Sequence, residues 1–139
     1  MSLFVFLERL FQGLKDSDLC VCGMAFHGKV VQTMNPVAAS YDYLVANSDF
    51  LQTFETGVMN STCNKLYKLS IIRHYNIQFP DAKVGEDYLF NLEYLQHIER
   101  VNYISEVLYH YDNTQSTLTR QASEEMFQTY YKTQLLMEQ

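Results

Sequence analysis

The sequence has no tryptophan, only two prolines and five glycines, and no apolar run that could span a bilayer. The apolar N-terminal stretch is interrupted by Glu8 and Arg9, well before the roughly 20 residues that a transmembrane helix needs. The chain contains no internal repeat, no low-complexity tract and no linker-like segment. Residues 1–139 are therefore expected to form a single domain, large enough to bury roughly two thirds of the unfolded surface.

Basic residues are in the minority. The chain has 10 Lys and Arg against 16 Asp and Glu, which gives a formal net charge of −6. Such a chain has no basic field with which to hold a phosphate backbone. Nucleic acid is therefore excluded as the expected partner.

Cysteine is also scarce and odd in number. Cys20, Cys22 and Cys63 occur without a secretory leader, which predicts a reduced, cytosolic compartment. The Cys-x-Cys pair lies in an apolar run, so both thiols would share one face of a strand. No further Cys or His stands at ligand spacing, so buried thiols are favoured over a metal site for this pair, and all three cysteines are interpreted as structural.

Hydrophobic spacing predicts the first half of the fold. Apolar residues at helical spacing predict a helix over residues 3–14, ending near Gly13 and lying on a sheet. The continuous apolar run 19–26, a glycine-containing turn and the short run 29–33 predict a hairpin. Its first strand is expected to be central and its second to be an edge.

The second half alternates short helices, loops and strands. Two paired helices are predicted within 40–56, preceded by Ser40 and Ser48, and an irregular loop is predicted over 57–64. A short helix over 69–75, an extended stretch over 76–79 and a helix over 86–98 follow. The remaining predicted elements are strands over 101–104 and 107–111, a polar loop over 112–119 and a final helix from Ser123 to about Met137.

Three motifs stand in a characteristic order. They are Asn64-Lys65-Leu66-Tyr67-Lys68, then Gly85-Glu86-Asp87 at a helix start, then Val107-Leu108-Tyr109-His110-Tyr111 with Ser116-Thr117-Leu118-Thr119-Arg120. Over about residues 3–120, this order resembles the acceptor-side half of a family 2 glycosyltransferase of the GT-A type. The resemblance implies an α/β fold: an incomplete GT-A-like domain with a short mixed sheet packed by helices, lacking the N-terminal nucleotide-binding βαβ half.

The resemblance assigns chemistry to the Glu-Asp pair. In such enzymes the Asp takes a proton from the attacking sugar hydroxyl, so Asp87 is the expected catalytic base. Base catalysis typically contributes about 10²–10⁴-fold, and the positive end of a helix stabilises a negative charge there. Adjacent helical residues diverge by about 100°, so Glu86 and Asp87 cannot both reach one hydroxyl. Glu86 is therefore expected only to support Asp87. The alternative is that both residues only complement the helix dipole.

Five further residues are implied to bind substrate. Asn64 and Lys65 would face the reaction centre, and Arg120 would give the donor diphosphate bidentate contacts. Tyr109 and Tyr111 share one face of a strand and could stack on a sugar. The alternatives are a turn Asn, a solvated Lys, a surface Arg and tyrosines that pack in the core.

The metal-binding Asp-x-Asp motif of the resembled family is not found in this chain at the position where the family has it. The preceding half of these enzymes ends in an Asp-x-Asp that binds a divalent cation. Asp16-Ser17-Asp18 matches those letters but lies between the first helix and the first strand, and is interpreted as a turn. No metal or cofactor is expected in this chain, whereas the complete enzyme would use Mg²⁺ or Mn²⁺.

The leading hypothesis is the acceptor-side portion of an inverting glycosyltransferase that assembles bacterial surface polysaccharide. It would be inactive alone. The complete enzyme would use a nucleotide-sugar donor and a glycan acceptor, in the cytoplasm or at the inner face of the membrane. One alternative is a non-catalytic interaction module of the same fold, associating as a homodimer through an exposed sheet edge. The other is a helix-rich regulatory domain in which Glu86 and Asp87 only cap a helix.

Overall fold

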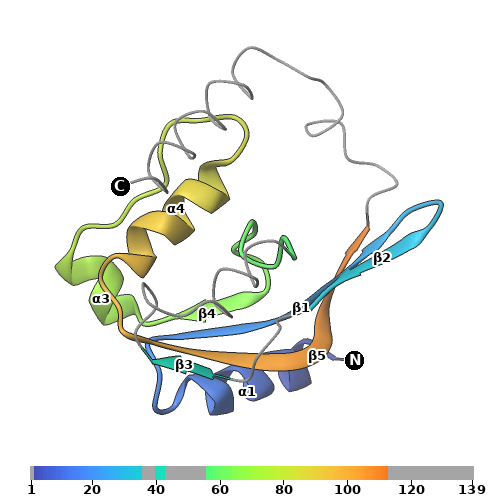
Figure 1. Cartoon of the computed structure of the whole chain (residues 1–139), viewed down its shortest axis with the longest axis horizontal. Helices are drawn as coiled ribbons and strands as arrows, with labels where there is room; N and C mark the ends of the chain where they lie inside the picture. Colours follow the sequence, from blue (N-terminus) through green and yellow to red (C-terminus); the bar gives the residue numbers. More distant parts are fainter. Residues whose placement is uncertain (1, 36–39, 43–55, 113–139) are drawn as a thin grey trace.

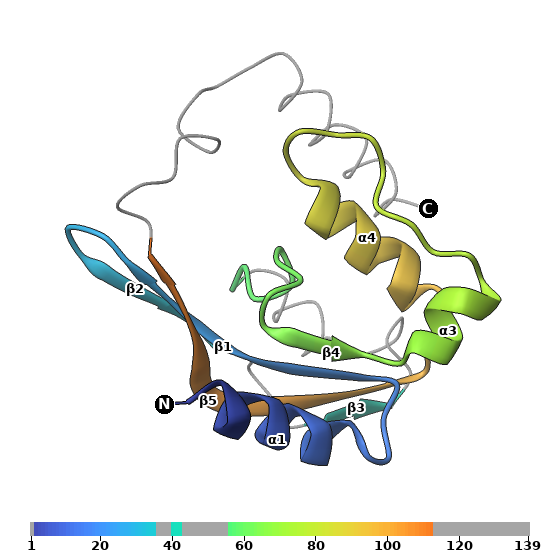
Figure 2. The ribbon, with the colours of Figure 1, turned by 180° about the vertical axis from the view of Figure 1, so that it is seen from behind.

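The computed structural model of the chain describes residues 2–35, 40–42 and 56–112. Its helices and strands, in chain order, are α1 (Leu3–Leu14), β1 (Leu19–His27), β2 (Val31–Met34), β3 (Ser40–Asp42), β4 (Lys65–Tyr67), α3 (Leu69–His74), α4 (Glu86–Leu95) and β5 (Arg100–Asp112). The strands form one mixed sheet, with α1 against one face and α4 over the other (Figure 1 and Figure 2). This is the α/β architecture that the sequence predicts.

β1 is the central strand of the sheet. Its residues from Leu19 to Ala25 are buried, and it pairs with three other strands. β2 and β4 pair antiparallel with β1, whereas β5 pairs with it in parallel and carries β3 on its other side. A strand covered on both faces needs a continuous apolar run rather than an alternating one. The predicted hairpin, with β2 at an edge, is confirmed.

The sheet separates two apolar clusters. Val21 of β1 lies in the cluster beneath α4, whereas Cys20 and Cys22 pack with Leu10 of α1 on the opposite face. The two thiols therefore share one face, as predicted. Cys63, which is also interpreted as structural, is exposed and lies in the loop before β4.

α1 has the predicted bounds and lies on the sheet as expected. The side chain of Ser2 accepts a hydrogen bond from the backbone N–H of Val5 at 3.3 Å, which caps the first turn. Gly13 allows the helix to approach β1 closely, since a Cβ at this position would lie 2.6 Å from the Sγ of Cys20. A larger residue there would force either the Cys20 side chain or the helix to shift.

α4 begins at Glu86, as predicted. Gly85 precedes it with a φ of 81°, a left-handed conformation that glycine adopts without strain. The helix ends at Leu95 rather than near residue 98. The chain turns there because β5 begins only five residues later, at Arg100.

β5 is one long strand, although the sequence predicts two, over 101–104 and 107–111. The connecting residues, Ser105 and Glu106, stay in the strand. The extra length is absorbed by shifts in the register between β1 and β5 at Gly23. An irregularity of this kind interrupts the alternation of side chains without ending the strand.

Two short strands differ from the sequence prediction. Ser40–Asp42 forms β3, which pairs antiparallel with β5, where the first of two paired helices is predicted to start. Lys65–Tyr67 forms β4 directly after the predicted loop 57–64, so Lys65, expected on a loop facing the reaction centre, begins a strand. Both strands have only three residues and are formed by pairing with distant segments, which local periodicity does not reveal.

The short helix α3 confirms the prediction over 69–75. Asn76 has a φ of 50°, so the stretch predicted to be extended begins with a left-handed residue. Residues 43–55, the loop after Asp112 and the final predicted helix lie outside the described residues. Within the described ranges, no helix is long and apolar enough to cross a bilayer.

Candidate functional site

The carboxylate of Asp87 is held by one of its two oxygens. Asp87 lies in the first turn of α4 and is half-buried. Its Oδ2 accepts a hydrogen bond from the backbone N–H of Thr62 at 3.1 Å and another from the Thr62 hydroxyl at 3.0 Å. Among the described residues, Oδ1 accepts no hydrogen bond. The carboxylate is thus fixed in orientation with one oxygen left for another group.

Glu86 stands beside it in the same turn and is also half-buried. Its side chain makes no hydrogen bond or ion pair within the described part of the chain. Since adjacent helical side chains diverge by about 100°, Glu86 does not share the contacts of Asp87. A supporting role for Glu86 stays a prediction.

Asn91 anchors the loop in which Thr62 lies. It is 1% exposed and stands four residues after Asp87, on the same side of α4. Its Nδ2 donates to the carbonyl oxygens of Met59 at 2.7 Å and of Ser61 at 3.2 Å. Its Oδ1 accepts a hydrogen bond from the Tyr67 hydroxyl. Two of these contacts hold the loop, and the third joins Asn91 to β4.

Asn64 and Lys65 are buried, at 0% and 6% exposed, so neither is the turn Asn or solvated Lys of the alternative interpretation. The Nδ2 of Asn64 donates to the carbonyl oxygens of Cys22 at 2.7 Å and Val58 at 3.1 Å. The Nζ of Lys65 donates to the Val58 carbonyl at 2.8 Å, to the Asn64 Oδ1 at 2.9 Å and to the Ser61 carbonyl. Direct contact of either residue with a substrate stays a prediction.

Burial disfavours the protonated, charged form of the Lys65 side chain. Burial lowers the pKa of Lys65 to about 7, against the opposing influence of Cys22, Asp87 and Cys63. Three acceptors match the three N–H groups of an ammonium. The lysine therefore organises the loop from within and brings a positive charge close to Asp87.

Tyr109 and Tyr111 lie opposite Met24 and Phe26 in adjacent strands, so they share one face as predicted. Tyr109 packs against Phe6 with ring centroids 6.0 Å apart, and Tyr111 packs against Phe26 at 5.5 Å. These contacts favour the interpretation of the tyrosines as packing residues.

Tyr109 also reaches the loop. The neighbouring Cys63 side chain raises the pKa of Tyr109. Among the described residues, no contact joins Tyr111 to this loop. Arg120 lies outside the described residues.

The Asp16-Ser17-Asp18 segment is a turn, as predicted. The Oδ2 of Asp18 accepts hydrogen bonds from the backbone N–H groups of Glu99 and Arg100, each at 3.1 Å. Its Oδ1 lies 3.5 Å from the Nζ of Lys68. Within the described ranges, no group of three or more His, Cys, Asp or Glu could hold a metal ion.

Sequence reasoning misses Thr62, Tyr67 and Asn91, although each contributes to this arrangement. Only Asn91 carries a signal, since a polar amide interrupts the apolar stripe of α4 one turn after Asp87. Thr62 is one of several small polar residues in a loop, and it meets Asp87 across 25 residues of sequence.

Asp87 does not line either of two surface hollows found among the described residues. One, of about 480 Å³, lies between the segment 76–80 and the side of α4 that carries Leu89 and Glu93. The other, of about 460 Å³, lies at the end of α1 beside Lys68.

No protein-family model and no curated protein matches the chain. Solved structures of TarS, a glycosyltransferase from S. aureus, are similar in fold. The structure of TarS residues 1–349 with UDP-GlcNAc gives a TM-score of 0.62 at 15% identity, over 96% of this chain and 37% of the TarS chain.

Two further TarS structures also cover 96% of this chain. The structure with UDP gives a TM-score of 0.57 at 17% identity and 33% of the TarS chain, and a third gives 0.56 at 15% identity and 34%. The chain thus spans about a third of the length of these neighbours. At such low identity the likeness shows the fold alone, which is that of part of a glycosyltransferase.

Proposed function

We propose that this chain is the acceptor-side portion of an inverting, nucleotide-sugar-dependent glycosyltransferase of family 2. The proposal rests on one observation: within a fold that matches part of a glycosyltransferase, the carboxylate of Asp87 is fixed through Oδ2 and has no hydrogen bond at Oδ1 among the described residues. A general base needs one oxygen within hydrogen-bond reach of the hydroxyl that it deprotonates.

The proposed reaction is a single displacement. As the acceptor hydroxyl attacks the anomeric carbon of the donor, Oδ1 of Asp87 takes the hydroxyl proton. The new glycosidic bond forms while the bond to the nucleoside diphosphate breaks, and the diphosphate leaves with its electron pair. Attack opposite to the leaving group inverts the anomeric carbon.

The donor and the cation belong to another part of the enzyme in this proposal. The described residues offer no ligand set for Mg²⁺ or Mn²⁺, and Asp18 is engaged by backbone groups. We assign the cation and the nucleotide to a preceding βαβ half, and a bacterial surface polysaccharide to the product. The complete enzyme would act in the cytoplasm or at the inner face of the membrane, and the present chain, folding as one domain, would be inactive alone.

The test uses the longest open reading frame that contains this sequence. The purified protein is incubated with UDP-GlcNAc and other UDP-sugars, Mg²⁺ or Mn²⁺, and a panel of cell-surface glycan fragments, and UDP release is measured. Asp87→Asn is expected to reduce acceptor-dependent release by about 10²-fold or more while donor binding is kept. Glu86→Gln is the matched control with a smaller loss. Acceptor-dependent release that persists at the wild-type rate in Asp87→Asn would refute the proposal.

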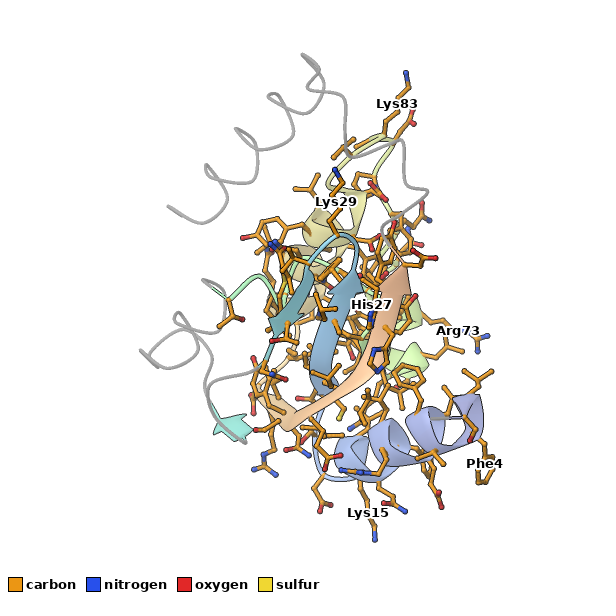
Figure 3. All side chains as sticks on the ribbon, turned by 90° about the vertical axis from the view of Figure 1, so that its right-hand side faces the viewer. Phe4, Lys15, His27, Lys29, Arg73 and Lys83 are labelled. Atoms are coloured by element: carbon orange, nitrogen blue, oxygen red, sulfur yellow. The ribbon has the colours of Figure 1, made fainter. Side chains whose placement is uncertain are left out.

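A second candidate function is favoured by a different observation. Four apolar side chains on the outer surface of α1 are 46–74% exposed, and we call them the α1 stripe: Leu3, Phe4, Leu7 and Phe11. Figure 3 shows Phe4 pointing away from the sheet. An exposed apolar patch suits a protein partner, and a non-catalytic interaction module would use it to form a homodimer.

Light scattering on the purified chain separates the two candidates. A dimer that persists in Asp87→Asn, together with no UDP-sugar binding by the full reading frame, would favour the interaction module. A monomer at high concentration, with UDP-sugar binding by the full reading frame, favours the transferase.

A further inference from the structure

Thr62 makes two hydrogen bonds to the same oxygen of Asp87. Its backbone N–H and its hydroxyl lie 3.1 Å and 3.0 Å from Oδ2. We propose that Thr62 is a positioning residue, which orients the Asp87 carboxylate so that Oδ1 is the oxygen presented to the acceptor. This inference rests on the proposed function, because it assigns a task within that reaction.

Two donors on one oxygen restrain the carboxylate more than one donor does. A single hydrogen bond leaves the group free to swing about its Cβ–Cγ bond, whereas two donors from different directions fix its plane. The rate of a displacement depends on such geometry, and a misplacement of about 1 Å can cost roughly 10²-fold. Fixing Oδ2 thereby fixes where Oδ1 points.

The peptide unit between Ser61 and Thr62 is itself held from the opposite side. Its carbonyl oxygen, on Ser61, accepts hydrogen bonds from the Nδ2 of Asn91 at 3.2 Å and from the Nζ of Lys65. Its N–H, on Thr62, donates to Asp87. Because the peptide group is planar, anchoring the carbonyl on two buried side chains aims the N–H at the carboxylate.

The donors behind this peptide unit are rigid. Asn91 and Lys65 are 1% and 6% exposed, and each makes two further hydrogen bonds that resist its rotation. The path from the core to the carboxylate therefore runs through buried side chains, one peptide unit and Thr62. A residue that acts through another in this way is expected to influence turnover more than donor binding.

The first experiment tests the contact on the chain itself and does not depend on activity. The hydrogen exchange rate of the residue-62 amide is measured by NMR in wild type, Asp87→Asn and Asp87→Ala. Loss of one hydrogen bond of about 1 kcal/mol corresponds to about fivefold faster exchange. We expect that acceleration in Asp87→Ala, which removes the acceptor, and less than a twofold change in Asp87→Asn, which keeps an amide oxygen there. Equal exchange in wild type and Asp87→Ala would overturn the proposal.

The second experiment tests the consequence in the full reading frame, with the UDP-release assay described above. Thr62→Val removes the hydroxyl while preserving size, and is expected to lower kcat roughly 10-fold or more with an unchanged KM for the UDP-sugar. Thr62→Ser keeps both donors and is expected to restore kcat to within about twofold of wild type. Thermal melts of both variants check that they fold.

The outcomes separate the two proposals. Wild-type kcat in Thr62→Val, with Asp87→Asn inactive, overturns the positioning role and leaves the proposed function standing. Equal losses in Thr62→Ser and Thr62→Val also overturn it, because the hydroxyl would then not be the determinant. Wild-type transfer by Asp87→Asn overturns the proposed function itself.

Discussion

The two faces of the sheet are covered by different kinds of side chain. Beneath α4, an apolar cluster is joined by buried polar side chains that hold the loop before β4: Asn64, Lys65 and Asn91. On the opposite face, the cluster beneath α1 consists of apolar side chains and two thiols. The outer surface of α1 carries the exposed α1 stripe (Figure 3).

This difference suits the α4 face to positioning a side chain and the α1 face to association with another protein surface. Buried polar groups are costly unless they are paired, so a network of them specifies one arrangement of the groups that it holds. The α4 face thus has the means to place a carboxylate accurately. The α1 face is held by non-directional burial and by isolated polar contacts, such as the hydrogen bond from Asn102 to the Gly13 carbonyl, and its exposed stripe is suited to contact with another surface.

The largest expected effect comes from removing the centre of the polar network. Asn91→Leu removes the hydrogen bonds to the Met59 carbonyl and the Tyr67 hydroxyl, and leaves the Ser61 carbonyl with Lys65 alone. Since each buried unsatisfied group costs about 1–3 kcal/mol, the free energy of unfolding is expected to fall by about 3 kcal/mol. Urea unfolding of the chain measures it.

A matched variant on the opposite face sharpens this comparison. The Nδ2 of Asn102 donates a single hydrogen bond, to the Gly13 carbonyl of α1 at 2.7 Å. Asn102→Leu is expected to cost only about 1 kcal/mol. Equal losses in the two variants would contradict the contrast between the faces.

The next effect is the pH dependence of stability that Lys65 causes on the α4 face. The pKa of Lys65 is lowered by burial from 10.5 to about 7. Between these values the unfolded chain holds a proton that the folded chain has released, so the free energy of unfolding increases as pH rises from about 7. Relative to Lys65→Met, wild type is expected to gain about 2 kcal/mol between pH 7 and pH 9.

The comparison with Lys65→Met is needed because the titration of other groups changes stability with pH in the opposite direction. Burial raises the pKa of Cys20 to about 12 and that of Cys22 to about 11. Their thiols ionise first in the unfolded chain, so stability falls as pH rises through 9. The Cys20 contribution is shared by both proteins and cancels in the difference. Lys65 lowers the pKa of Cys22, so the Cys22 contribution differs between them, and the urea unfolding comparison is therefore made between pH 7 and pH 9, where the effect of Lys65 dominates. A difference that is flat with pH would mean that Lys65 is not desolvated.

Much of the α1 face could be predicted from the sequence. The helix over 3–14 and the hairpin that follows are encoded by patterns of adjacent residues, namely apolar spacing and a continuous apolar run. The helix that carries Asp87 is marked in the same way. Such signals are local, so they identify elements without a knowledge of the fold.

The candidate site could be predicted only in part, because its contacts join distant segments. A Lys in the middle of a polar motif is expected to be solvated. Lys65 is buried because the loop that precedes it folds back and supplies the carbonyls of Val58 and Ser61. The contact of Thr62 with Asp87 also depends on how this loop folds, and no residue spacing in the sequence predicts it.

A smaller effect on stability is expected from the α1 stripe. Phe4→Ser and Phe11→Ser change side chains that are 74% and 72% exposed, so each is expected to alter the free energy of unfolding by at most about 0.5 kcal/mol. Association of the chain, measured by light scattering, is expected to be lost in the double variant. Phe6→Ser, on the side that packs with Tyr109, is the control that destabilises the fold. A double variant that still associates would remove the stripe as the contact surface.

The smallest effect is expected at the ion pair that joins α1 to β5. The two guanidinium nitrogens of Arg9 donate to the two carboxylate oxygens of Glu106, at 3.0 Å and 2.5 Å. This geometry holds the pKa of Glu106 below its ordinary value.

Both side chains are nevertheless open to water, where screening and the loss of side-chain freedom offset the attraction. Glu106→Gln is therefore expected to leave the urea midpoint within experimental error, at low and at high salt. A clear loss that disappears in high salt would show that this exposed ion pair also holds α1 on the sheet, and the division between the two faces would have to be withdrawn.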